Sequence, residues 1–91
     1  MPRLNFNSVL WDPEDDPDGN VQHIAEHHLT VEEVEAVFEN PTGTGTSRRS
    51  GRPAVFGETG TGRYIIVVYE VVDASTVYPV TAYDVPRRNR P

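Results

Sequence analysis

The segment from Arg63 to Asp84, RYIIVVYEVVDASTVYPVTAYD, constrains the fold more than any other part of the sequence. Up to Val72 it is almost entirely β-branched or aromatic, which favours a largely buried strand, and the run is too short for a buried helix. The break at Asp73–Ser75 separates it from Thr76–Tyr83, so the segment predicts an antiparallel hairpin. Because Pro79 has no N–H to give to a neighbour, we expect the second strand to be an edge strand or to carry a bulge.

Two short helices are expected before this hairpin. Apolar positions spaced along Asn20–His27 predict the first helix. Thr30 followed by Glu33 is a capping box, which predicts a second helix that ends at Asn40-Pro41. Helices this short are unstable alone and need a sheet to pack on. With a short strand or core anchor expected at Val9–Trp11, a short strand at Pro53–Gly57 and strand character in Thr42–Ser47, the pattern predicts an α+β fold. Two N-terminal helices then pack on one face of a small antiparallel sheet whose other face is partly open.

The length and composition limit the remaining possibilities. Ninety-one residues predict one domain, 1–91, with frayed ends at 1–7 and 86–91. Without cysteine the chain has neither disulfides nor a thiolate metal site. The longest apolar run is far shorter than a membrane span, and the N-terminus lacks a signal-peptide pattern. We therefore expect a cytoplasmic protein with no membrane contact.

Charge is distributed unevenly along the chain. Residues 1–40 carry ten acidic side chains and a single arginine, whereas residues 41–91 carry seven arginines against four acidic side chains, and no lysine occurs anywhere. The planar fork of arginine suits phosphate and carboxylate groups. The alternative is that the arginines only reflect composition and lie solvated along strand edges.

Arginines and tyrosines on a small sheet form a pattern that suits RNA. Cleavage by the 2′-hydroxyl needs a base, an acid and positive charge around the phosphorane. Candidate phosphate ligands are Arg48, Arg49, Arg52 and Arg63, and candidate proton-transfer or base-stacking groups are Tyr69, Tyr78, Tyr83, Glu58 and His27. The alternative is that the tyrosines pack in the core and the arginines are solvated.

Three other patterns resemble metal or phosphate sites but are better explained as structure. His23 and His27 are four residues apart, as zinc ligands on a helix are, but no third ligand follows, and Glu26 precedes the second histidine instead of following the first. The acidic stretch Glu14–Asp18 lacks the ligand spacing of a calcium loop. The glycines of Gly57–Gly62 lead into a strand without the lysine of a phosphate-binding loop. We expect no metal and no cofactor.

A series of short motifs runs in order from about Leu10 to Arg88. They are Trp11-Asp12-Pro13, Asn20 with His27, Thr30-Val31-Glu32-Glu33 with Val37-Phe38 and Asn40-Pro41, Gly62–Tyr69, Val80–Tyr83 and Arg87-Arg88. The order and spacing of these motifs resemble the BrnT toxin family of bacterial type II toxin–antitoxin systems.

The resemblance implies a fold related to RelE and a metal-independent endoribonuclease that acts on mRNA. It also implies a ribbon-helix-helix antitoxin as partner, and it leaves open whether the protein forms a homodimer. We take His27, Tyr83 and Arg63 as catalytic candidates and Arg48, Arg49, Arg52 and Tyr69 as RNA-binding candidates. Where the family has arginine, lysine and glycine, this chain has Tyr83, Glu26 and His28. The alternative is therefore a catalytically inactive module of the same fold that binds protein or RNA.

Overall fold

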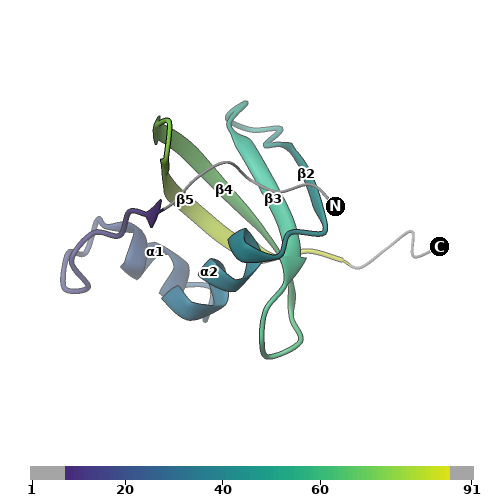
Figure 1. Cartoon of the computed structure of the whole chain (residues 1–91). Coiled ribbons are helices and arrows are strands. Elements are labelled where there is room, and N and C mark those ends of the chain that lie inside the picture. Colours follow the sequence, from purple (N-terminus) through teal and green to yellow (C-terminus); the bar gives the residue numbers. More distant parts are fainter. Residues whose placement is uncertain (1–7, 87–91) are drawn as a thin grey trace.

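The computed structural model describes residues 8–86, which form a five-stranded sheet with two helices (Figure 1). The elements in chain order are β1 (Ser8–Val9), α1 (Asn20–Ala25), α2 (Val31–Glu39), β2 (Gly43–Thr46), β3 (Pro53–Glu58), β4 (Tyr64–Asp73) and β5 (Thr76–Asp84). The predicted frayed ends lie outside the described residues, apart from Pro86. No helix in this part of the chain is long and apolar enough to span a membrane.

The predicted hairpin is confirmed as β4 and β5, which pair antiparallel from Ile65 opposite Asp84 to Asp73 opposite Thr76. At the turn, the Ser75 main-chain N–H donates to Asp73 Oδ1 at 2.9 Å. Local bonds of this kind favour aspartate in turns. Beside Pro79 the register shifts: Val68 pairs with Thr81, but Tyr69 pairs with Pro79. One extra residue in β5 at this point is a β-bulge, so the bulge alternative is correct.

The sheet is mixed, which corrects the prediction of an antiparallel sheet. Its strand order is β1-β5-β4-β3-β2, and β1 runs parallel to β5, with Ser8 opposite Thr76 and Val9 opposite Val77. A parallel pair needs a long crossover, and here nearly the whole chain separates the two strands. A strand of two residues is too short for sequence alternation to indicate its partner or its direction.

Helix α2 begins as predicted. The Glu33 N–H donates to Thr30 Oγ1 at 3.2 Å, and the Thr30 N–H donates to Glu33 Oε1 at 3.0 Å, which completes the capping box. Helix α1 ends at Ala25, two residues before the predicted end at His27.

A Schellman motif explains the early end of α1. His28 has a φ of 62°, the Leu29 N–H donates to the Ile24 carbonyl at 3.1 Å, and the His28 N–H donates to the Ala25 carbonyl at 2.9 Å. These two bonds close the motif around a left-handed residue, a position that glycine normally occupies. Leu29 and Ile24, the apolar pair that accompanies the motif, are both in the core.

His28→Gly is therefore expected to stabilise the protein. A non-glycine residue in the left-handed region costs about 1 kcal/mol, and relieving that cost should raise the melting temperature by about 4–8 °C in a domain of this size. Thermal unfolding followed by circular dichroism measures the change. His28→Ala is the matched control, because it removes the imidazole but keeps the strain, and an equal gain from both variants would contradict the argument.

The buried apolar side chains form two clusters, one on each side of the sheet. The larger one joins both helices to the sheet and contains Ile24, Leu29, Val34, Val37, Phe38, Val55, Ile65, Val67, Tyr69, Val77 and Ala82. The smaller one lies on the opposite side of the strands and contains Ala54, Ile66 and Val68, with Phe56, Tyr83 and Val85 packed against them. Ile66 and Val68 are buried at the centre of this second face, whereas Phe56, Tyr83 and Val85 are half-buried.

Candidate functional site

A surface pocket of about 510 Å³ brings together four of the predicted site residues: His27, Arg49, Arg52 and Tyr83. They come from the end of α1, the β2–β3 connection and β5. Its other lining residues are Ser47, Ser50, Val68, Val80 and Thr81. Two guanidinium groups, three hydroxyl-bearing side chains, an imidazole and a phenol around an apolar floor form a lining that suits a phosphate group with an attached base.

Hydrogen bonds shape the β2–β3 connection that carries the arginines. The Ser47 N–H donates to the Arg52 carbonyl at 2.7 Å and the Gly51 N–H donates to the Ser47 carbonyl at 2.8 Å. Gly51 has a φ of 75°, the left-handed conformation in which glycine is unstrained. This closed turn carries Arg49 and Arg52, which both line the pocket. Arg48 lies in the same turn but does not line the pocket.

The two pocket arginines differ in their partners. Arg49 forms no ion pair with any residue between 8 and 86. Arg52 Nε lies 2.7 Å from Glu70 Oε2, in a pair whose side chains are 40% and 50% exposed. Exposed pairs of this kind contribute little and exchange readily with a competing anion. Both guanidinium groups are therefore available to a phosphate.

His27 and Tyr83 lie next to each other in the pocket lining, with 5.8 Å between their ring centroids and an angle of 49° between the ring planes. His27 is exposed just beyond α1, and Tyr83 is half-buried on β5, opposite Ile66. Imidazole and phenol groups both donate and accept hydrogen bonds and both offer a flat face to a base. This pair is the part of the pocket that can carry out proton transfer.

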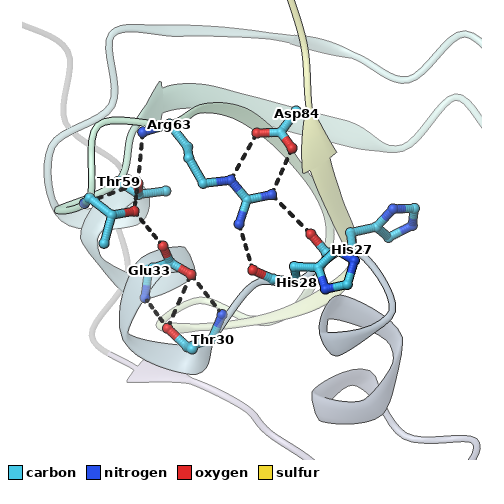
Figure 2. A network of polar contacts seen from close by, with 8 residues as sticks. His27, His28, Thr30, Glu33, Thr59, Arg63 and Asp84 are labelled. Atoms are coloured by element: carbon cyan, nitrogen blue, oxygen red, sulfur yellow. Dashed lines mark hydrogen bonds and ion pairs between the residues drawn. The ribbon is translucent and has the colours of Figure 1, made fainter.

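Arg63 does not line the pocket but holds its wall in place (Figure 2). Its Nε and Nη2 donate to the two oxygens of Asp84 at 3.0 and 2.6 Å, Nη2 also donates to the His27 carbonyl at 2.9 Å, and Nη1 donates to the His28 carbonyl. These bonds use four of the five N–H groups of the guanidinium. They place a cation at the C-terminal end of α1, where the helix dipole is negative. Arg63 thus links the main chain of His27 to Asp84, the residue that follows Tyr83.

A second layer of bonds supports Arg63. Its main-chain N–H donates to Thr59 Oγ1 at 3.1 Å, the hydroxyls of Thr59 and Thr61 lie 2.8 Å apart, and Thr61 Oγ1 donates to Glu33 Oε2 at 2.6 Å. Glu33 is also the capping residue of α2, so one chain of contacts links α2, the β3–β4 turn and Arg63 (Figure 2). The guanidinium of Arg63 lowers the pKa of the Asp84 carboxyl, and the Thr61 hydroxyl lowers that of Glu33.

Tyr69 is placed where it does not fit the predicted contact with RNA. Its side chain is 8% exposed in the helix-side cluster and packs edge-on against Phe38, with 5.3 Å between ring centroids. Ile65 and Val67 of β4 belong to the same cluster, whereas Ile66 and Val68 belong to the cluster beside the pocket. Because every residue from Tyr64 to Tyr69 is apolar or aromatic, alternation could not indicate which face Tyr69 occupies.

The histidine segment and the tryptophan-aspartate motif have different surroundings. No group of three or more His, Asp or Glu side chains within residues 8–86 could hold a metal ion. His27 contacts Tyr83, whereas the Trp11 indole N–H donates to Glu35 Oε2 at 2.9 Å.

Asp12 and Asn20 form a network that joins the segment after β1 to β5. Asp12 Oδ2 accepts the Tyr78 hydroxyl at 2.6 Å and the Asn20 N–H at 3.0 Å, and the Asp12 N–H donates to Asn20 Oδ1 at 2.9 Å. Asn20 Nδ2 donates to the carbonyls of Leu10 and Pro79, each at 3.0 Å. The sequence did not indicate this structural role for Asn20, because its partners are distant in the chain.

Stability should fall at alkaline pH because of this network. The bond to Asp12 raises the pKa of Tyr78 to about 12, from 10.0. A pKa raised on folding stabilises the protein while the phenol is neutral below pH 10, and this contribution is lost as the pH rises through 12. We expect the urea midpoint of the wild type to fall more between pH 10 and 12 than that of Tyr78→Phe. Tyr64→Phe is the control, and equal pH dependence in wild type and Tyr78→Phe would contradict the assignment.

Comparison with known proteins finds no match: no protein-family model, curated protein or solved structure matches the chain. The resemblance to BrnT rests on the sequence motifs alone and stays a prediction.

Proposed function

We propose that this protein is a BrnT-like toxin, a metal-independent endoribonuclease that acts on mRNA. The observation that supports the proposal most is the pocket whose lining contains the His27–Tyr83 pair together with Arg49 and Arg52. Those residues were chosen from the sequence as proton-transfer and phosphate-binding groups, and they come from three separate segments of the chain.

The chemistry proposed is an attack of a ribose 2′-hydroxyl on the adjacent phosphate. The 2′-O–P bond forms, the P–O5′ bond breaks, and the products are a 2′,3′-cyclic phosphate and a free 5′-hydroxyl. One member of the His27–Tyr83 pair accepts the proton of the 2′-hydroxyl, and the other donates a proton to the leaving O5′. Arg49 and Arg52 balance the charge that develops on the phosphorane oxygens. Arg63 acts as a positioning residue, since its bonds to the His27 carbonyl and Asp84 hold His27 near Tyr83.

The same resemblance leads us to propose a RelE-like arrangement and a ribbon-helix-helix antitoxin as partner. Such a toxin would act in the cytoplasm, where mRNA is translated. A homodimer is also compatible with this proposal.

The alternative is an RNA- or protein-binding module of the same fold that does not cleave RNA. Two observations favour it: Tyr83 and Glu26 stand where the family has basic residues, and four N–H groups of Arg63 are bonded within the protein. Arg49 and Arg52 are the only arginines that line the pocket among the described residues.

The decisive experiment incubates the purified protein with end-labelled single-stranded RNA in excess EDTA. Cleavage that yields a 2′,3′-cyclic phosphate supports the nuclease, and the same RNA with a 2′-deoxy substitution at the cleaved position should resist. Binding measured by fluorescence anisotropy without cleavage would support the binding module instead. The toxin proposal would be refuted if the protein neither bound nor cleaved RNA and if its expression in a bacterium left growth normal and mRNA intact.

A further inference from the structure

A second pocket of about 490 Å³ lies between the segment after β1 and the two helices. Its walls are largely apolar, and acidic side chains stand at its margin. The lining residues are Trp11, Asp12, Glu14, Val21, Ile24, Ala25, Leu29, Thr30, Val31 and Glu32. None of them lines the His27–Tyr83 pocket, so this is a separate surface.

The charged side chains that line the second pocket, Asp12, Glu14 and Glu32, are all acidic. Residues 8–40 contain ten acidic side chains and neither lysine nor arginine. The two ion pairs found among residues 8–86, Arg52–Glu70 and Arg63–Asp84, involve none of these ten. Glu14 and Glu32 are exposed, whereas the Asp12 carboxylate is already used by Tyr78 and Asn20. Such a field attracts cationic partners and repels the phosphates of a nucleic acid.

Trp11 gives this pocket an anchor typical of protein interfaces. Its indole is half-buried in the pocket wall, and its N–H is fixed by Glu35 at 2.9 Å. Tryptophan is enriched among the residues that contribute most to protein binding. An apolar pocket with a polar, charged margin is the arrangement of an interface core and its rim.

We propose that this pocket docks a basic amphipathic segment of a partner protein. An aliphatic side chain of the segment enters between Trp11, Val21 and Val31, and flanking lysines or arginines meet Glu14 and Glu32. The proposal does not depend on the nuclease function, because it uses a different surface.

Short synthetic peptides and the fluorescence of Trp11 test the proposal, since Trp11 is the only tryptophan of the chain. The probes are a lysine–leucine peptide, a lysine–serine peptide of equal charge and a glutamate–leucine peptide. We expect the lysine–leucine peptide to shift the Trp11 emission and to bind about tenfold tighter than either control. An unchanged emission, or equal binding of the lysine–serine peptide, would overturn the proposal.

Two matched double variants locate the site. Glu14→Lys with Glu32→Lys should weaken binding of the lysine–leucine peptide about tenfold. Asp15→Lys with Asp18→Lys makes the same change in net charge at exposed positions outside the pocket and should have a much smaller effect. Equal losses would show a general charge effect and overturn the proposal. The proposal would also be overturned, in favour of a second copy of this chain, if the wild type sedimented as a dimer and only the Glu14/Glu32 variant sedimented as a monomer.

Discussion

Replacing Asn20 by alanine is expected to lower the free energy of unfolding by about 3 kcal/mol, because each buried polar group left unpaired costs about 1–3 kcal/mol. Asn20 is 1% exposed, and its side chain bonds the Asp12 N–H and the carbonyls of Leu10 and Pro79. Alanine would leave all three without a side-chain partner. The expected fall in melting temperature is about 15 °C for a domain of this size.

Urea and thermal unfolding followed by circular dichroism measure the loss. His23→Ala is the matched control, since it truncates an exposed side chain on the same helix and should change stability by less than about 0.5 kcal/mol. Asn20→Asp should be nearly as damaging as alanine, because aspartate keeps the shape but lacks both Nδ2 donors. A melting temperature within a few degrees of wild type for Asn20→Ala would contradict the role given to this network.

Features with a local signal were predictable from the sequence. The β4–β5 hairpin follows from a β-branched run, an aspartate turn and a proline, all within residues 63–84. The capping box needs only Thr30 and Glu33, three residues apart. In both cases the residues that interact are near one another in the chain, so pattern and structure agree.

Features that depend on tertiary contacts were not predictable. The sequence indicates Asn20 as a helix start and as part of the family motif, but its partner Pro79 is 59 residues away. The sequence predicts Arg63 as a phosphate ligand and catalytic residue, but its guanidinium is bonded to Asp84 and to two carbonyls just beyond α1. A sequence does not show that the β4–β5 register places Asp84 across from Ile65, beside Arg63. An arginine at this position indicated binding to an external anion, but in the fold the anion bound by Arg63 is the carboxylate of Asp84.

The second large effect is expected at His27, where alanine should reduce the rate of RNA cleavage about 10²- to 10⁴-fold, the usual contribution of a general acid or base. RNA affinity should change little, because Arg49 and Arg52 remain. Single-turnover cleavage and anisotropy, measured on the same RNA, separate the two quantities. His23→Ala again serves as the control, since His23 is a similarly exposed histidine that does not line the pocket. Equal cleavage by wild type and His27→Ala would remove His27 from the reaction.

The arginines then distinguish a phosphate ligand from a positioning residue. Arg49→Ala should weaken RNA binding and reduce the slope of log affinity against log salt by about 1, as expected for one lost phosphate contact, without changing the melting temperature.

Arg63→Ala should leave that slope unchanged but destabilise the protein by about 2 kcal/mol, because it removes charge-assisted bonds from a side chain that is 27% exposed. Its cleavage rate should fall because His27 is no longer held beside Tyr83. A reduced salt slope for Arg63→Ala would instead return Arg63 to the phosphate-binding role that its position in the sequence suggests.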